Sequence, residues 1–277
     1  MQTPYQARFF LLVLALSAGA ALAQPPAPSG FEPSVGQDGK DVVWVPTPQA
    51  LVDKMLAMAR VTPNDYLIDL GSGDGRTVIT AAKRGVRALG IEYNPEMVEL
   101  SRRNAQKEGA GERAAFVKAD LFETDLSKAT VITMFLLDRL NLQLRPRLLD
   151  LKPGLRIVSN TFTMGDWSPD EQVNAYEKEG CQSYCVAYLW IVPAKVQGHW
   201  KLPQGELTLK QNFQMLSGQL RAGDKVLPVS GRVRGERVTF KAGDVDYAGR
   251  VNGDRIDGGA GWSATRVRSP GPVPRKT

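Results

Sequence analysis

A short acidic, glycine-rich run contains the residues of this sequence that are best suited to bind a ligand. Residues 66–76 read Tyr-Leu-Ile-Asp-Leu-Gly-Ser-Gly-Asp-Gly-Arg, so Gly71, Gly73 and Gly75 follow an apolar stretch that contains Asp69. Glycines at such a turn let bare backbone approach a ligand at the start of the next helix. The spacing G-x-G-x-G, with an acid before it, differs from the G-x-G-x-x-G of dinucleotide sites. We therefore expect a cationic or hydrogen-bond-donating ligand here.

Two more acids follow apolar runs further along the chain, Glu92 after residues 88–91 and Asp120 after residues 115–119. Ligands of open parallel sheets bind beyond the carboxyl ends of the strands, so Asp69, Glu92 and Asp120 should share one crevice. A carboxylate at Glu92 can accept hydrogen bonds from both ribose hydroxyls. Asp120 is placed to accept from an adenine amino group, with the backbone amide of Leu121 beside it. S-adenosylmethionine (SAM), which carries a sulfonium and an ammonium, suits this set.

The residues around these positions predict alternating strands and helices. Strands are expected at 66–69, 88–92, 115–119, 130–135 and 156–160, with further candidates near 172–178 and 184–192. One helix should begin with Thr47 as its N-cap, and another should begin with Asn94 as its N-cap. A helical stretch near 138–150 should be interrupted or restarted at Pro146. This alternation predicts an α/β fold, a doubly wound, mostly parallel Rossmann-like sheet with helices on both faces.

A different pattern begins near residue 197, where short alternating segments are separated by glycines. Three of them share a small-Gly-x-Leu/Val core, at Ser217, Ser230 and Ala248. Two continue into Arg-Gly-Glu-Arg and Asn-Gly-Asp-Arg, which are hairpin turn signals. We expect a small antiparallel all-β domain, a meander or open barrel, over 195–268. Residues 42–194 would form the α/β domain, and 269–277 a disordered tail.

The first residues have the three parts of a secretory signal peptide. Arg8 is followed by an apolar run that ends in Ala21-Leu-Ala23, which predicts cleavage before Gln24; an uncleaved anchor helix is the alternative. Residues 1–23 are thus expected to be a signal peptide, and 24–41, rich in Pro, Gly and Ser, a disordered linker. The protein would be exported to the periplasm or secreted. In an exported protein Cys181 and Cys185 can pair only if the chain turns between them; otherwise both are packing residues.

The charge of the chain is unevenly distributed. The formal net charge is +6, and residues 195–277 contain fifteen basic and seven acidic side chains. This excess indicates either contact with an acidic partner or anionic membrane surface, or an ordinary solvated surface. Basic runs interleaved with aromatic residues are absent, so a nucleic-acid partner is not favoured. With one histidine, His199, and two cysteines, no metal site is expected.

Over residues 42–194 the sequence resembles the class I, seven-β-strand SAM-dependent methyltransferases. The segments starting at Asp69, Glu92 and Asp120, together with Phe162-Thr-Met-Gly-Asp-Trp-Ser-Pro-Asp, resemble the small lysine methyltransferases that modify mitochondrial inner-membrane proteins. The segment Trp44-Val-Pro-Thr-Pro fits the same enzymes. The resemblance implies these cofactor-binding residues: Trp44, Thr47, Asp69, Gly71, Ser72, Gly73, Gly75, Glu92, Asn94, Asp120 and Leu121.

The resemblance implies transfer of a methyl group from SAM to a nucleophilic acceptor, such as a protein lysine amine or a small molecule. An exported SAM- or nucleoside-binding module without catalysis is the alternative. Met134 and Phe135 should border the methyl donor, and Phe135, Phe162 and Trp167 either form an apolar acceptor pocket or pack in the core. Met134-Phe-Leu-Leu replaces the polar motif of the related histone enzymes, so no catalytic residue is assigned. Asp138 and Asp166 are candidate bases or amine-orienting groups; the alternative is that each is a helix cap or a loop acid.

Overall fold

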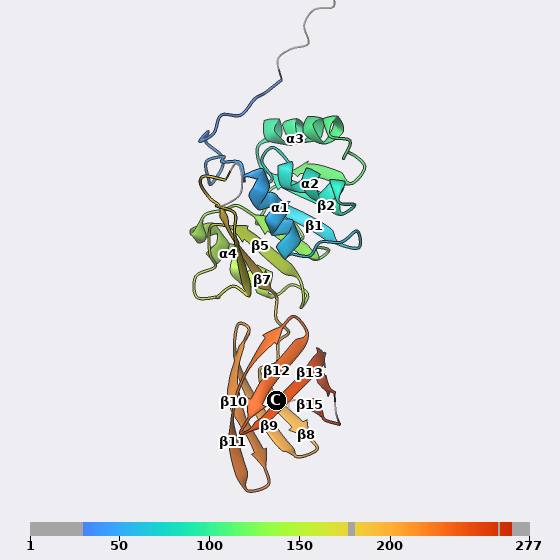
Figure 1. Ribbon diagram of the computed structural model, residues 1–277, viewed down its shortest axis with the longest axis vertical. Helices are drawn as coiled ribbons and strands as arrows, with labels where there is room; N and C mark the ends of the chain where they lie inside the picture. Colours follow the sequence, from blue (N-terminus) through green and yellow to red (C-terminus); the bar gives the residue numbers. More distant parts are fainter. Residues whose placement is uncertain (1–29, 177–180, 260, 268–277) are drawn as a thin grey trace, which may run out of the picture. The chain divides into compact units, whose positions relative to one another are not determined.

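The computed structural model describes residues 30–176, 181–259 and 261–267. The expected signal peptide 1–23, the first six residues of the expected linker and the expected tail 269–277 lie outside these ranges. The chain divides into Met1–Gly30 and Phe31–Thr277, and every helix and strand described here belongs to the second unit (Figure 1). Within the described ranges, no helix combines the length and hydropathy needed to cross a bilayer.

A seven-stranded sheet with the order β3-β2-β1-β4-β5-β7-β6 organises residues 66–191. Its strands are β1 (Tyr66–Leu70), β2 (Arg87–Glu92), β3 (Ala114–Lys118), β4 (Val131–Met134), β5 (Arg156–Asn160), β6 (Glu171–Asn174) and β7 (Val186–Ile191). The first five are parallel, whereas β7 runs antiparallel to β5 and β6 antiparallel to β7. The strand order reverses between β1 and β4, which is where ligands bind in such sheets.

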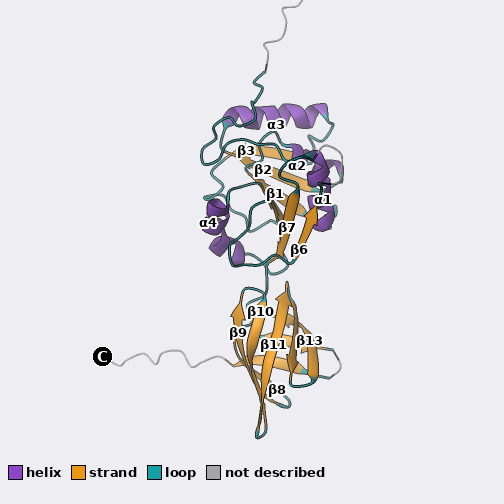
Figure 2. Cartoon of the chain, turned by 60° about the vertical axis from the view of Figure 1, so that its left-hand side comes forward, coloured by secondary structure: helices purple, strands orange, loops and turns teal. Residues whose placement is uncertain are grey.

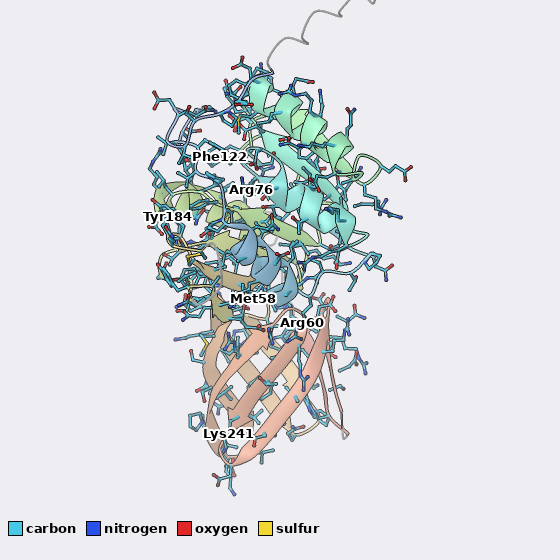
Figure 3. The ribbon with its side chains drawn as sticks, turned by 45° about the horizontal axis from the view of Figure 1, so that its top comes forward. Met58, Arg60, Arg76, Phe122, Tyr184 and Lys241 are labelled. Atoms are coloured by element: carbon cyan, nitrogen blue, oxygen red, sulfur yellow. A yellow bond between two sulfur atoms is a disulfide. The ribbon has the colours of Figure 1, made fainter. Side chains whose placement is uncertain are left out.

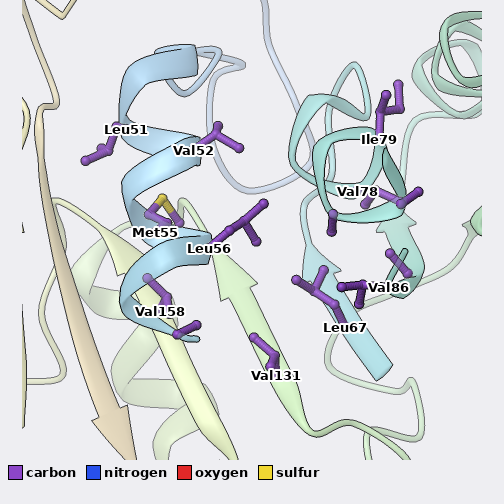
Figure 4. Packing of buried hydrophobic residues seen from close by; sticks show 14 of the residues in the cluster. Leu51, Val52, Met55, Leu56, Leu67, Val78, Ile79, Val86, Val131 and Val158 are labelled. Atoms are coloured by element: carbon purple, nitrogen blue, oxygen red, sulfur yellow. The ribbon is translucent and has the colours of Figure 1, made fainter. Parts of the chain in front are cut away.

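Helices cover both faces of the sheet, as the alternation of its buried residues requires. Leu67, Val131 and Val158 face the hydrophobic core beneath α1 (Gln49–Met58) and α2 (Arg76–Lys83), which Figure 4 shows in close-up; α3 (Pro95–Lys107) joins the same core. The next residue in β1 and β4, Ile68 and Ile132, belongs to the opposite core, where α4 (Asp138–Leu149) packs. The expected doubly wound, mostly parallel α/β fold is confirmed.

Two expected helix boundaries are wrong. Pro48, and not Thr47, is the N-cap residue of α1, because the Thr47 hydroxyl accepts a hydrogen bond from the Asn160 amide (3.2 Å) instead of capping the helix. Pro146 does not interrupt α4, which runs through it, since buried Leu144 and Leu148 fix the helix on either side. The expected cap of α3 is present, as the Asn94 side chain accepts from the backbone amide of Glu96 (2.9 Å).

The C-terminal strands form a closed barrel in the order β10-β11-β12-β13-β14-β15-β8-β9 (Figure 2). They are β8 (Gly198–Leu202), β9 (Gly205–Asn212), β10 (Met215–Ala222), β11 (Lys225–Arg234), β12 (Arg237–Ala242), β13 (Val245–Asn252), β14 (Arg255–Gly258) and β15 (Ser263–Val267). The expected all-β domain is confirmed, but the barrel is closed and not open, because the last strand, β15, pairs with the first, β8.

Apolar side chains fill the barrel, Trp200 and Phe240 among them. The repeated glycines lie within its strands and not in turns. A Cβ atom at Gly231 would lie 2.3 Å from the backbone oxygen of Thr239, so only glycine allows the strands to approach this closely. The domain boundary expected between residues 194 and 195 stays a prediction; the first barrel strand begins at Gly198.

Cys181 and Cys185 form a disulfide, with Cα atoms 5.8 Å apart. Residues 182–184 bend between the cysteines, so the chain makes the turn that pairing requires, and β7 begins only at Val186. Part of the expected linker is structured as well. Trp44 exchanges backbone hydrogen bonds with Gly36 (2.8 Å) and Gln37 (2.9 Å), and these bonds hold the chain from residue 36 to 44 in a defined loop.

Candidate functional site

One cavity lies at the carboxyl ends of β1, β2 and β4, and residues 37–47 form another part of its wall. Ten of the eleven predicted cofactor residues line it: Trp44, Thr47, Asp69, Gly71, Ser72, Gly73, Glu92, Asn94, Asp120 and Leu121. Met134 and Phe135 line it too, and their position beside the methyl donor stays a prediction. Gly75 is not part of the wall. Its Cβ would lie 2.8 Å from the Phe116 ring, so this glycine lets the turn pack on β3.

The glycine turn has a backbone conformation that favours glycine. Gly71 and Gly73 have left-handed φ angles of 74° and 54°, which side chains rarely adopt. A Cβ at Gly73 would lie 2.6 Å from Nε1 of Trp44, so the Trp44 indole covers this point of the turn. The amides of Gly71 and Ser72 both donate to the Ile91 carbonyl (2.9 and 3.0 Å), which joins the turn to β2.

Glu92, at the end of β2, ties the turn to the loop before α3. Its Oε2 accepts from the Gly73 amide (3.0 Å), and its Oε1 accepts from the amides of Tyr93 (2.8 Å) and Asn94 (2.9 Å). Each carboxylate oxygen carries two lone pairs, so the three amides leave one lone pair, on Oε2, free to accept from a ribose hydroxyl. Binding of ribose by Glu92 stays a prediction.

Asp69 is a buried carboxyl at the end of β1, with only 6% of its surface exposed. Its Oδ1 accepts a hydrogen bond from the Thr133 hydroxyl at 2.6 Å. Burial raises the pKa of Asp69 to about 7; the nearby carboxylates of Asp74 and Glu92 add to this, and the Thr133 bond opposes it. A bound cation would favour the ionised form of Asp69, because opposite charges stabilise each other.

Asp120, after β3, has a partner that the sequence did not suggest. Lys40 forms an ion pair with its Oδ2, while the Phe122 amide donates to Oδ1 (2.8 Å). The Lys40 hydrogen bond lowers the pKa of the Asp120 carboxyl. The Lys40 ammonium also lies 4.7 Å from the centre of the Tyr93 ring. Lys40 was missed because it belongs to the expected linker; Asp120 as the adenine partner stays a prediction.

Arg76, labelled in Figure 3, was also missed, although it directly follows the glycine turn. Its guanidinium binds the Asp74 carboxylate through Nε and Nη2 and donates from Nη1 to the Thr47 carbonyl (3.0 Å). Arg76 therefore connects the start of α2 to the segment 37–47. The pattern of the sequence contained no signal for this contact, because it depends on where the segment folds back.

An adenosyl sulfonium fits this half of the cavity. The turn leaves room for a ligand against bare backbone at Gly71 and Gly73. The buried carboxyl of Asp69 favours a cation. The buried hydroxyl of Ser72 has no hydrogen-bond partner among the described residues. Among the residues that the structure describes, no group of His, Cys, Asp and Glu side chains is arranged to hold a metal ion.

The other half of the cavity is aromatic. Phe135 and Phe162 stack with ring centres 6.0 Å apart, and Tyr184, labelled in Figure 3, lies 5.2 and 6.5 Å from them. All three line the cavity. Trp167, expected as a possible third wall, is fully buried and packs on Trp190 instead. Tyr184 is the third aromatic residue of the cavity wall, and sequence spacing could not predict this position.

Neither candidate base reaches the cavity wall. Asp138 accepts hydrogen bonds from the amide and hydroxyl of Thr163 (2.7 and 3.0 Å). Asp166 is largely exposed and forms an ion pair with Arg145. Both acids therefore fasten the loop that follows β5, and no catalytic base is assigned.

Residues 69–171 match the model of the ANTKMT methyltransferase domain. A protein-lysine N-methyltransferase of Saccharolobus islandicus is 43% identical over 154 residues, which make up 54% of this chain and 94% of that protein. The adenine nucleotide translocase lysine N-methyltransferase of Mus musculus is 33% identical over 138 residues, 47% of this chain and 60% of that protein. The chain thus spans nearly all of the Saccharolobus relative and less than two thirds of the mouse one.

A solved structure described as an RNA methyltransferase from Salinibacter ruber in complex with S-adenosyl-L-homocysteine is 44% identical. The similarity covers 55% of this chain and 96% of that one, with a TM-score of 0.50. The names of these similar proteins therefore agree on methyl transfer and differ on the acceptor.

Proposed function

Because the chain belongs to the protein-lysine N-methyltransferases, which are class I SAM-dependent enzymes, we propose that it methylates the side-chain amine of a lysine within a protein. SAM is its cofactor. The observation that carries the proposal is a single cavity that is lined both by the glycine turn with Glu92 and by the rings of Phe135 and Phe162. The turn and the carboxylate suit an adenosyl group, and the rings suit an alkyl amine.

Bound SAM would supply an electrophilic methyl group, so the residues of this chain need to orient donor and acceptor and keep the acceptor amine neutral. Trp44, Glu92 and Asp120 are proposed to hold the adenosyl part, with Asp69 beside the positive charge. An apolar wall disfavours a charged ammonium and so lowers the pKa of an entering lysine. Close, aligned placement supplies much of the remaining acceleration.

RNA is the second candidate acceptor, because the similar structure from Salinibacter ruber is described as an RNA methyltransferase. Lysine is favoured, since both curated relatives described above are named as lysine methyltransferases. The absence of an Asn-Pro-Pro-aromatic motif after β4, where the chain reads Met-Phe-Leu-Leu from Met134, also argues against nucleobase amines.

Labelled SAM tests the proposal. The full chain is incubated with SAM carrying a labelled methyl group and, separately, with cell-envelope protein, total RNA and the small-solute fraction. We expect label in protein, recovered as methyllysine after acid hydrolysis, and no label with Gly73→Ala, which places a Cβ against the Trp44 indole. Label confined to RNA or to small solutes would contradict the proposal.

We also propose that the protein is exported. The signal-peptide pattern that ends at Ala23 supports export, as does the Cys181–Cys185 disulfide, because such bonds persist in oxidising compartments. The N-terminus of the protein from an envelope or culture fraction should be Gln24. A cytoplasmic protein that keeps Met1 would contradict export and leave the methyl transfer proposal unaffected.

The barrel is proposed to contact an acidic partner or membrane surface, given the fifteen basic and seven acidic residues of 195–277. Lys210, Arg221 and Lys241 are exposed on its strands. Vesicles with anionic lipid should bind the protein at low salt and release it as salt rises, and neutral vesicles should not. Equal binding to both kinds of vesicle would contradict an electrostatic contact.

A further inference from the structure

The aromatic end of the cavity includes a residue held in place by the disulfide. Cys181 and Cys185 are buried in the hydrophobic core (4% and 0% exposed), whereas the three residues between them are exposed. Tyr184 is the last of these three, and its ring meets Phe135 and Phe162. A short loop with both ends buried and covalently joined has little freedom to move the ring.

The backbone on both sides of this contact is held in an unfavourable conformation. Tyr184 has φ 55° and Thr161, next to Phe162, has φ 60°, and both are left-handed conformations that non-glycine residues seldom adopt. The Thr161 amide donates to the Val186 carbonyl (2.7 Å), and the Cys185 carbonyl accepts from the Ala175 amide (2.8 Å). The first bond joins the Tyr184 loop to the Phe162 loop, whereas the second bond and the disulfide fix the Tyr184 loop itself, so both rings are kept at the cavity wall.

From this arrangement we propose that Tyr184, fixed by the Cys181–Cys185 disulfide, completes with Phe135 and Phe162 an aromatic group that packs on the alkyl chain of the acceptor amine and stabilises the positive charge that its nitrogen gains on methylation; the role in catalysis rests on the proposed lysine substrate. Aromatic faces attract cations and also pack on methylene chains. A lysine side chain offers both, four methylenes followed by a nitrogen.

The methyl transfer places positive charge where these rings are. The lone pair of the neutral amine forms a bond to the methyl carbon, the carbon–sulfur bond breaks, and its electron pair stays on sulfur. The positive charge thereby moves from sulfur to nitrogen, and the methylated ammonium later loses a proton to solvent. Ring faces that attract a cation stabilise the charge that develops on nitrogen.

A titration with n-butyltrimethylammonium tests the aromatic group without catalysis. The probe is added to the oxidised full chain loaded with S-adenosylhomocysteine, and binding is followed by calorimetry. Tyr184→Phe should bind as the wild type does. Tyr184→Ala and Tyr184→Leu should bind at least fivefold more weakly, with cofactor affinity unchanged within twofold. Tyr184→Leu keeps apolar volume without a ring face, and Tyr176→Ala, which removes an exposed ring outside the cavity, is the matched control.

The disulfide is tested in the same titration. The Cys181→Ser/Cys185→Ser variant and the wild type treated with reductant should both show weaker probe binding, and reduction of Tyr184→Ala should change nothing further. Wild-type affinity in Tyr184→Ala, or loss of cofactor binding in both Tyr184→Ala and Tyr184→Leu, would overturn the inference. Unchanged probe binding after reduction would overturn the proposed role of the disulfide in fixing Tyr184.

Activity separates this inference from the proposed function. A library of peptides, each with one lysine, is supplied with SAM, and kcat/KM for the best peptide should fall about tenfold in Tyr184→Ala and remain near wild type in Tyr184→Phe. If the wild type methylates no lysine peptide and no envelope protein, the proposed function fails, while the ammonium titration still decides whether the aromatic group exists. If lysine is methylated equally well by Tyr184→Ala, only this inference fails.

Discussion

Glu92 accepts hydrogen bonds from three backbone amides and also lines the cavity. We expect Glu92→Gln to weaken SAM binding by about 10- to 100-fold, the cost of one charged hydrogen bond of about 1.5–3 kcal/mol. Calorimetry measures the affinity. Glu96→Gln, on the exposed first turn of α3, is the matched control and should bind like the wild type. Equal affinities in all three proteins would contradict the assignment of Glu92.

Asp69 makes cofactor binding depend on pH. Its pKa of about 7 in the free folded protein should fall when a cation binds beside it, so binding releases a proton below pH 7. SAM affinity should therefore rise about tenfold from pH 6 to pH 8. Titrations in buffers of different ionisation enthalpy measure the released proton. Asp69→Asn has no carboxyl proton to release, so any pH dependence that remains in this variant comes from other ionisable groups, including those on SAM. An identical pH dependence in the wild type and in this variant would contradict the prediction.

The same carboxyl should affect stability in the absence of cofactor. The folded-state pKa of Asp69 lies above its ordinary value of 3.8, so its contribution to the free energy of unfolding is complete below pH 3.8 and is lost as pH rises through about 7. The melting temperature should fall more between pH 5 and pH 8 in the wild type than in Asp69→Asn. An equal loss in the two proteins would show that the carboxyl is already ionised at pH 5 in the free protein.

At the scale of the elements, the segment 37–47 lines the cavity, and Lys40 in this segment forms an ion pair with Asp120. We expect Lys40→Met to raise both the association and the dissociation rate of SAM by about threefold or more, because an exposed ion pair no longer holds the segment against Asp120. Stopped-flow fluorescence measures both rates. Lys83→Met, which removes an exposed pair with Glu108, is the control; unchanged rates in Lys40→Met would show that the segment does not gate entry.

The sequence predicted those parts of the elements that local patterns determine. Local neighbours in the chain determine the turn from Asp69 to Gly75, the strand end at Glu92 and the α/β alternation, and the structure has these features where they were expected. Gly75 differs only in that it packs on β3 and does not line the cavity. Lys40 and Tyr184 could not be found in this way, because their partners lie far away in sequence. Trp167 was ambiguous for a related reason, since spacing does not tell a cavity wall from a buried core.

At the scale of the whole molecule, Asp170 beside β6 and Arg232 in β11 connect residues of the sheet and barrel regions. The Asp170 carboxylate is 1% exposed, and it accepts from Arg232 and from the Ile191 amide (2.8 Å). Arg232→Ala leaves this carboxylate with one partner fewer and should lower the free energy of unfolding by about 1–3 kcal/mol. Arg234→Ala removes a more exposed pair with Glu171 and should cost less than about 1 kcal/mol. Urea unfolding compares the two; equal losses would contradict this difference.

The pairing of β15 with β8 also bears on how the barrel can be attached to other domains. Arg266 lies opposite Trp200, so the barrel begins and ends on adjacent strands. A domain whose first and last strands lie side by side can be joined to a neighbour through either end without opening a strand pair.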